Sequence, residues 1–280
     1  MGDLADKVWF VTGASVGFGR ALCERVIRRG GRLMATARNP ASLSDLIDRA
    51  PDSSAAAKLD VTDPDQILAA AAAAKARFGC IDGLVNCAGY GFLGAVEEAS
   101  DAEIRAQFEV NFFGLANVTR ALLPSMRAQR SGMIVNFSSI AGACGYPGSG
   151  VYCASKWAVE GLSESLAAEL EPFGIRVLIV EPGPFRTDFA GRSIAVPARP
   201  IGAYAAAAAL RDWSASMDGV QPGDPVRAAD TVIDTVLDKS PPMRLILGAS
   251  ALETARKASR ARMDDVERSR EVAAAADFPG

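Results

Sequence analysis

The stretch KVWFVTGASVGFGR, Lys7 to Arg20, joins a short apolar run to a turn that holds three glycines. The run from Lys7 to Gly13 is typical of a buried strand, and an amphipathic segment from Gly17 to Arg29 follows it. Gly13 permits a tight turn, and Gly19 lets the following helix pack closely on the strand. The stretch therefore predicts a strand, a glycine turn and a helix, which is the opening unit of an α/β sheet.

The alternation of short apolar runs and longer helical patterns continues along the chain. Further strands are expected at Arg32–Ala37, Ala55–Leu59, Ile81–Gly89, Gly132–Ser139, Ile175–Gly183 and within 243–248. Further helices are expected at Ser42–Ala50, after Asp63 and Pro64, and at Asp101–Leu123, Tyr152–Phe173 and Pro225–Asp238. This order predicts a doubly wound parallel sheet of about seven strands, flanked by helices, as a single domain over residues 1–280.

Two segments depart from the alternation. Residues 184–223 hold several prolines, and the alanine cluster Ala205–Ala209 favours a helix. We expect this segment to form a helical substrate lid near the carboxyl ends of the strands, where ligands of such sheets bind. Residues 250–280 are expected to form a charged, largely helical tail.

The composition excludes several classes of protein. The chain has no histidine, which removes the Ser-His-Asp hydrolases, the Cys-His proteases and histidine-ligated metal sites, and we predict no metal site. A formal net charge of −3 argues against a nucleic-acid partner. No apolar run approaches the roughly 20 residues that span a bilayer, and no signal peptide is evident. The five cysteines show no metal-ligand spacing, so we expect reduced thiols in a cytoplasmic protein.

The glycine turn also predicts a ligand. Gly17 lets the backbone approach a pyrophosphate closely, and the amino end of the following helix attracts an anion. The strand at Arg32–Ala37 is followed by Arg38, and no carboxylate occurs before Asp45. A carboxylate at this point would bind the ribose 2′-hydroxyl of NAD, whereas Arg38 could pair with the 2′-phosphate of NADP or simply face solvent. The sequence thus favours NADP(H) and leaves NAD(H) as the alternative.

A second pattern, GVYCASKWAVE at Gly150–Glu160, places Tyr152 and Lys156 one helical turn apart. A free tyrosine has a pKa near 10, and a nearby ammonium group favours the phenolate and lowers that pKa. Tyr152 could then donate a proton to a carbonyl oxygen or remove one from an alcohol. Alone, the pair could equally lie on a helix surface. Ser139 ends the preceding strand and could hold the substrate oxygen, and Asn111 stands mid-helix, where a polar role is expected.

Together these motifs resemble the classical short-chain dehydrogenase/reductase family. The resemblance rests on TGASVGFG, NCAG, Asn111, the serine pair that ends at Ser139, YCASK and PGPFRT, in the family's order. It implies a Rossmann-type sheet and hydride transfer between a nicotinamide cofactor and a carbonyl or alcohol substrate. It also implies a catalytic set of Tyr152 as acid/base, Ser139 orienting the substrate, Lys156 lowering the tyrosine pKa, and Asn111 supporting a proton relay.

The resemblance further implies a set of cofactor contacts. These are Gly13, Ser15, Gly17, Phe18, Gly19, Arg38, Asp60, Val61, Asn86, Ala88, Gly89, Tyr152, Lys156, Pro182, Gly183, Phe185 and Thr187. Two positions depart from the family pattern. Cys87 replaces the second asparagine of NNAG, and Val16 stands where many NADP-preferring members carry a basic residue, which leaves Arg38 as the main expected phosphate contact.

The substrate is expected to be a hydrophobic small molecule with a carbonyl or alcohol group. Aromatic and sulfur-containing side chains of the lid could line an apolar pocket, or could instead pack the lid on the core. They are Phe185, Phe189, Tyr204, Trp213 and Met217, with Tyr146 from the loop after Ser139. The charged tail differs from the short strand that ends 3-oxoacyl carrier-protein reductases, so a homodimer and a homotetramer both stay open.

Two other classes of protein share parts of this pattern. A cofactor-binding sensor on the same fold would typically have lost Tyr152 or Lys156, and both are present. A sugar-nucleotide epimerase or dehydratase would favour a TGxxGxxG spacing and a larger carboxyl-terminal domain, which this chain lacks. The sequence favours an active NADP(H)-dependent oxidoreductase.

Overall fold

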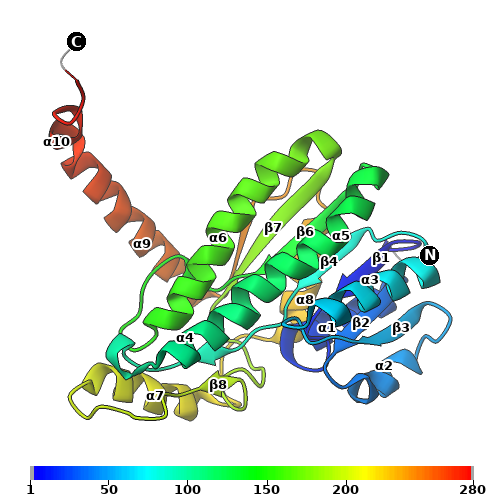
Figure 1. Ribbon diagram of the computed structural model, residues 1–280, viewed down its shortest axis with the longest axis horizontal. Helices are drawn as coiled ribbons and strands as arrows, with labels where there is room; N and C mark the ends of the chain where they lie inside the picture. The colour runs from blue at the N-terminus through cyan, green and yellow to red at the C-terminus, as the bar shows by residue number, and fades with distance from the viewer. Residues whose placement is uncertain (1–2, 279–280) are drawn as a thin grey trace.

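A seven-stranded sheet forms the centre of the computed structural model, which describes residues 3–278 (Figure 1). The strands are β1 (Val8–Val11), β2 (Arg32–Ala37), β3 (Ser54–Lys58), β4 (Gly83–Asn86), β6 (Gly132–Phe137), β7 (Ile175–Pro182) and β9 (Arg244–Leu247). They pair in the order β3-β2-β1-β4-β6-β7-β9, and every pairing is parallel. The order reverses between β1 and β4, which is where a doubly wound sheet binds its ligand. The predicted fold is confirmed.

Helices cover both faces of the sheet and bury a separate core on each. One core packs α1 (Gly17–Arg28) and α8 (Pro225–Leu237) on the sheet, and the two helices contact each other. The opposite core packs α3 (Pro64–Phe78), α5 (Leu115–Gln129) and α6 (Gly150–Leu170). Because both faces are covered, β1 and β4 are buried along their whole length, which explains why all of β1 is apolar and why β4 has a polar side chain only at its last residue, Asn86.

Local signals set the helix ends. Asp63 caps α3, since its Oδ1 accepts hydrogen bonds from the backbone N–H of Asp65 (3.0 Å) and Gln66 (3.1 Å), and Pro64 begins the helix. Ser100 and Glu103 form a capping box at the start of α4 (Asp101–Phe108). The predicted start of the α3 helix is therefore confirmed.

Two predicted helices differ from the structure. The helix expected over Asp101–Leu123 is α4, a π-helical segment η3 (Glu109–Gly114) and α5, which ends only at Gln129. The helix expected over Ser42–Ala50 is a 3₁₀ turn η1 (Pro40–Leu43) followed by the single turn α2 (Ser44–Ile47). Periodicity alone does not distinguish α from π winding, because one inserted residue shifts the pattern only locally.

The lid segment 184–223 contains α7 (Ala205–Met217) and the two-residue strand β8 (Ile194–Ala195). β8 pairs in parallel with β5 (Gly91–Phe92), which follows the glycine-containing turn after β4. The sequence analysis did not predict this pair, because two residues carry no periodic signal.

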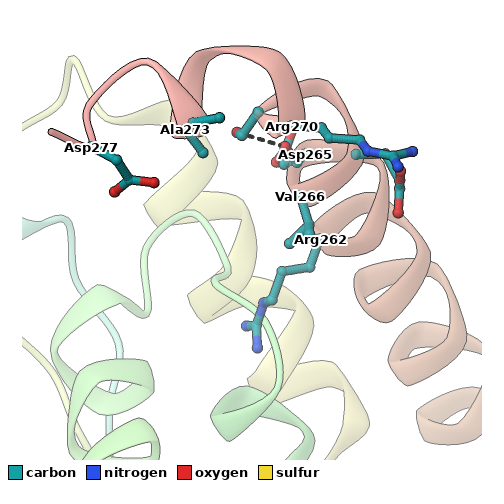
Figure 2. A pocket seen from close by; sticks show the side chains of 9 residues that line it. Arg262, Asp265, Val266, Arg270, Ala273 and Asp277 are labelled. Atoms are coloured by element: carbon teal, nitrogen blue, oxygen red, sulfur yellow. Dashed lines mark hydrogen bonds between the residues drawn. The ribbon is translucent and has the colours of Figure 1, made fainter. Parts of the chain in front are cut away.

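The tail is helical, as predicted, and consists of α9 (Ala249–Arg268) and α10 (Arg270–Ala274). Ala251 and Ala255 at the start of α9 pack against Ile140, while the rest of the tail extends away from the sheet (Figure 1). A hollow lies where α9 meets α10 (Figure 2), and none of its lining residues belongs to the predicted site. No helix among residues 3–278 combines the length and apolarity needed to cross a membrane.

Candidate active site

The turn after β1 requires glycine at three positions. Gly13 has φ +67°, and a Cβ atom there would lie 2.9 Å from Ala88 Cα. A Cβ atom on Gly19 would collide with the carbonyl oxygen of Gly13. Gly17 has φ +57°, a backbone conformation that other residues rarely adopt. The roles expected for Gly13 and Gly19 in the turn and in helix packing agree with this geometry.

The amino end of α1 is left open to an anion. Its N-cap is Val16, within residues 3–278 no side chain caps it, and no acidic residue lies in its first turn. The first backbone N–H groups of a helix lack intrahelical partners and carry a partial positive charge. Ser15 and Phe18 flank this end, and the Phe18 ring packs against Phe137 at a centroid distance of 5.3 Å. Phe18 therefore supports the turn through packing.

Thr12 braces the NCAG turn after β4, a role that the sequence analysis missed. Its Oγ1 accepts hydrogen bonds from the backbone N–H of Cys87 (3.0 Å) and Ala88 (3.1 Å). Asn86 turns inward, where its Nδ2 donates to Thr119 Oγ1 (3.0 Å) and to Asn136 Oδ1 (2.9 Å). The side chain of Asn86 thus links β4 to β6 and α5, and the turn reaches a ligand through its backbone.

The carboxylates beyond β2 and β3 are already engaged, whereas Arg38 is not. Asp45 accepts from Arg20 (2.9 Å) and Arg49 (3.4 Å). Asp60 Oδ1 accepts from the backbone N–H (3.0 Å) and hydroxyl (2.8 Å) of Thr62, and Val61 packs against Gly114. Arg38 is exposed and has no hydrogen-bond or ion-pair partner in the described part of the chain. An available guanidinium at this position suits an anionic group.

Tyr152, Lys156 and Ser139 come together at the junction of α6 and the end of β6. The Tyr152 side chain is only 8% exposed, and Lys156 Nζ lies 5.8 Å from the centroid of its ring. Lys156 is 6% exposed and donates to the carbonyl oxygen of Phe137 at 2.9 Å. Ser139 Oγ accepts from the backbone N–H of Ala141 at 3.1 Å. Ser139, 13 positions before Tyr152, and Lys156, four positions after it, are thus assembled around one phenol.

Burial has the largest effect on the pKa values of Tyr152 and Lys156. It raises the pKa of Tyr152 to about 12, against a lowering by the nearby Ser139 hydroxyl. It also lowers the pKa of Lys156 to about 8. Burial of the phenol is the largest influence on this pKa, and the lowering expected from Lys156 stays a prediction. A positive charge beside the phenol would lower its pKa toward neutrality.

Asn111 occupies the π-helical segment η3 and is fully bonded. Its Nδ2 donates to Tyr90 O (2.9 Å) and Ser155 Oγ (3.2 Å), and its Oδ1 accepts from Tyr90 N–H (3.1 Å). A Cβ atom on Gly89 would lie 3.1 Å from Asn111 Oδ1 and 3.6 Å from Lys156 Nζ. Asn111 therefore holds the segment at Gly89–Tyr90 beside Lys156, and π-helical turns often occur at functional sites.

The lid passes over these residues. The Phe189 ring lies 5.8 Å from the Tyr152 ring, centroid to centroid, and its edge lies 3.0 Å from where a Cβ atom of Gly91 would be. Thr187 lies against Gly17, at 3.5 Å from the corresponding Cβ position. Pro182 ends β7, and Gly183 N–H donates to Leu247 O at 2.9 Å. The lid thus begins at the glycine turn and covers the tyrosine.

The other side chains considered for the apolar pocket have mixed roles. Phe185 stacks on Phe18 at 5.1 Å and packs against the core, and the Tyr204 hydroxyl donates to Glu97. Trp213 is half exposed on α7, and Met217 is half-buried. Tyr146 packs with Tyr152 and Cys153. Phe189 and Tyr146 are therefore the members of the set that pack beside Tyr152.

A nicotinamide dinucleotide fits this arrangement. The glycine cradle has no room for side chains, the amino end of α1 is uncapped, and Lys156 uses one protein acceptor although an ammonium has three donors. Anion-binding backbone, a free guanidinium at one end and a phenol at the other match the parts of such a molecule. The fold and site define a dinucleotide-dependent oxidoreductase of the open α/β class.

The comparisons with known proteins give the family. Residues 7–195 match the family model described as short chain dehydrogenase. An oxidoreductase of Botryotinia fuckeliana, named BOA17, is 38% identical over 270 residues, which cover 96% of this chain and 98% of the relative. The chain belongs to the short-chain dehydrogenase/reductase family, and it is an NAD(P)-dependent oxidoreductase.

Solved structures agree. A short-chain dehydrogenase from Streptomyces avermitilis is 42% identical, with a TM-score of 0.90 over 97% of this chain and all of that chain. A family member from Burkholderia phymatum was solved with NAD. It is 28% identical with a TM-score of 0.82, and the match covers 95% of this chain and 96% of that chain. A short-chain dehydrogenase from Burkholderia cenocepacia was solved with NADP. It is 29% identical with a TM-score of 0.75, and the match covers 95% of this chain and 98% of that chain. Related proteins therefore use either cofactor.

Proposed function

We propose that this protein is an NADP(H)-preferring oxidoreductase that interconverts the carbonyl and alcohol of a hydrophobic small molecule, with Tyr152 as the acid/base. The observation that carries the proposal is the buried Tyr152 phenol, with Ser139 and Lys156 beside it and Phe189 over it. A buried phenol of this kind, at the edge where the sheet binds its ligand, is placed to exchange a proton with a substrate oxygen.

The residues divide the work as follows. Bound NADPH supplies a hydride for the carbonyl carbon. The Ser139 hydroxyl donates a hydrogen bond to the substrate oxygen and holds it near Tyr152, and the Tyr152 O–H donates its proton to that oxygen as the alcohol forms. Lys156 contributes the positive charge that opposes the burial-raised pKa of Tyr152. Asn111 keeps the Gly89–Tyr90 backbone beside Lys156.

The preference for NADP(H) rests on Arg38. Its guanidinium is exposed and without a partner in the described residues, while Asp45 is neutralised by Arg20 and Arg49. A charge-assisted pair with a 2′-phosphate would favour NADP over NAD. We expect Arg38→Ala to raise the Kd for NADPH about tenfold or more and to leave the Kd for NADH within about twofold, measured by fluorescence titration.

The substrate class rests on the apolar surface around Tyr152. Phe189 and Tyr146 pack beside its ring, so a ketone or alcohol with an apolar body would bury surface there.

The single-domain organisation, the cytoplasmic location and the homodimer or homotetramer remain predictions.

Absorbance of NADPH and NADH at 340 nm, followed over a panel of apolar ketones and aldehydes, tests the proposal. Wild type should turn over at least one carbonyl faster with NADPH, and Tyr152→Phe should lose at least about 100-fold in kcat while it still binds NADPH. Tight NADPH binding with no turnover on the panel would favour the alternative of a cofactor-binding sensor.

A further inference from the structure

A buried charge cluster lies one helical turn beyond Lys156 and has no part in the chemistry described above. Arg244 on β9 donates to Glu160 of α6 (Nε to Oε2, 3.1 Å), and its Nε lies 3.3 Å from Glu181 Oε1 on β7. Its Nη2 pairs with Glu164 on the exposed side of α6. Glu160 is 8% exposed and Glu181 is 2% exposed. Two buried carboxylates share one guanidinium, an arrangement with a large desolvation cost.

One oxygen of Glu160 does not face the arginine. Glu160 Oε1 is buried and has no hydrogen-bond partner among the described residues, and the same is true of Ser138 Oγ. Both atoms border Gly142, where a Cβ atom would lie 2.5 Å from Ser138 Oγ and 3.1 Å from Glu160 Oε1. The unpaired carboxylate oxygen therefore faces the serine pair and the turn that follows Ser139.

Glu160 also shares a buried face of α6 with Lys156. The two residues are one turn apart and both are buried, so a charge on one is screened less by solvent than it would be at the surface. Burial lowers the pKa of Lys156 to about 8, whereas the Cys87 thiol and the Glu160 carboxylate raise it. Cys87 is a weak contributor at neutral pH, because burial raises its own pKa to about 12 and keeps it a neutral thiol. Glu160 is thus the anion that opposes loss of the lysine charge.

We propose that Glu160 is a positioning residue of this reaction, whose carboxylate keeps Lys156 in the ammonium form while Arg244 and Glu181 control the charge on Glu160. The inference rests on the proposed function, in which Lys156 supports Tyr152. The charged and polar groups that face Glu160 are Lys156 and Glu164 on α6, Ser138 after β6, Glu181 on β7 and Arg244 on β9.

The pH behaviour of the cluster follows from its burial. Burial raises the pKa of Glu160, and burial together with the Glu160 charge raises the pKa of Glu181 to about 7. Glu181 therefore gains its negative charge as the pH rises through neutrality, and burial shifts the ionisation of Glu160 in the same direction. The Lys156 pKa of about 8 already includes the raising effect of Glu160, so without that carboxylate Lys156 would lose its charge at lower pH. The cluster extends the pH range over which Lys156 stays charged.

A titration of Lys156 in the cofactor-free protein tests the inference without turnover. The chain has six lysines, so protein labelled with ¹³C at lysine Cε gives few resonances, and Lys156→Arg identifies the relevant one. Glu160→Gln should lower the Lys156 midpoint by roughly one pH unit, the effect of a unit charge one turn away at a partly screened site. Glu164→Gln, which removes a carboxylate from the exposed side of Arg244, should move it by less than about 0.3 unit. Equal midpoints in wild type and Glu160→Gln would overturn the inference.

A second measurement keeps the test valid if Glu160→Gln does not fold. In wild type, the Lys156 resonance should show an additional inflection near neutral pH, where Glu181 titrates beside Glu160, and a single inflection would overturn the inference. Kinetics separate it from the proposed function. If wild type reduces carbonyls, the basic limb of its kcat/KM profile should move to lower pH in Glu160→Gln. If wild type reduces none, the proposed function fails, and with it the catalytic use of Glu160, whatever the NMR midpoints are.

Discussion

Replacement of Thr12 by valine tests how the two loops of the site are held together. The Thr12 hydroxyl is buried and accepts from two backbone N–H groups, those of Cys87 and Ala88, at 3.0 and 3.1 Å. Valine has nearly the same shape but cannot accept a hydrogen bond, so Thr12→Val leaves both donors unpaired. A buried donor left unpaired costs about 1–3 kcal/mol, and both donors belong to partly buried residues. We expect a loss of about 2–4 kcal/mol in the free energy of unfolding.

Urea unfolding followed by circular dichroism measures this loss, and Thr36→Val is the matched control. Thr36 is also buried, but its hydroxyl donates to Val11 O at 3.0 Å, so its removal leaves no donor unpaired and should cost about 1 kcal/mol. If Thr12→Val costs no more than Thr36→Val, the two hydrogen bonds do not hold the NCAG turn, and this reasoning is refuted.

Three further predictions concern the glycine turn, the charge cluster and the lid. Gly19→Ala should abolish measurable NADPH binding, since its Cβ atom would collide with the carbonyl oxygen of Gly13, and normal binding would contradict this packing argument. The control Gly161→Ala, where the new Cβ atom lies in open space on α6, should bind NADPH normally and gain about 0.5–1 kcal/mol in the free energy of unfolding measured with urea. Burial raises the pKa of Glu181 to about 7, so its contribution to stability is present below the ordinary carboxyl pKa and is lost as the pH rises to about 7. Glu181→Gln should therefore flatten the fall in the free energy of unfolding between about pH 4.5 and 7, and an unchanged slope would show that Glu181 titrates normally. Phe189→Ala should change the ratio of kcat/KM for bulky ketones to kcat/KM for small ketones by about tenfold or more. Trp213→Ala, at a residue that is half exposed on α7, should change this ratio less than twofold, and equal effects of the two variants would place Phe189 outside the substrate site.

Much of the fold was predictable because its signals are local. The strands are continuous apolar runs, since helices cover both faces of the sheet, and Asp63 with Pro64 marks the start of α3 in the sequence itself. The glycines at 13 and 19 are required by contacts within the turn or with the adjoining strand end. The predictions failed where the cause was distant or subtle. The π-helical turn around Asn111 goes with three hydrogen bonds, two to the backbone of Tyr90 and one to Ser155.

In the candidate site, too, the local features were predictable from the sequence and those that depend on distant contacts were not. The spacing of Tyr152 and Lys156 indicates a pair on one helix, but a sequence does not report how far each side chain is buried. Burial raises the pKa of Tyr152, an effect that the spacing of the pair does not predict. Thr12 was inside the quoted motif, yet its partners are 75 and 76 residues away. Phe189 reaches Tyr152 through the pairing of β5 with β8, which has only two residues in each strand.

The sequence by itself determined the order of strands and helices, the glycine turn, the absence of histidine chemistry and the family motifs, because periodicity, turn residues and composition act over a few neighbouring positions. Tertiary structure alone decided which polar atoms are buried, which carboxylates share Arg244, and how the lid lies over Tyr152. These properties depend on solvent exclusion and on contacts between residues far apart in the sequence, such as Glu160 and Arg244, which are 84 positions apart. Desolvation acts on the assembled site, and no pattern along the chain encodes its magnitude.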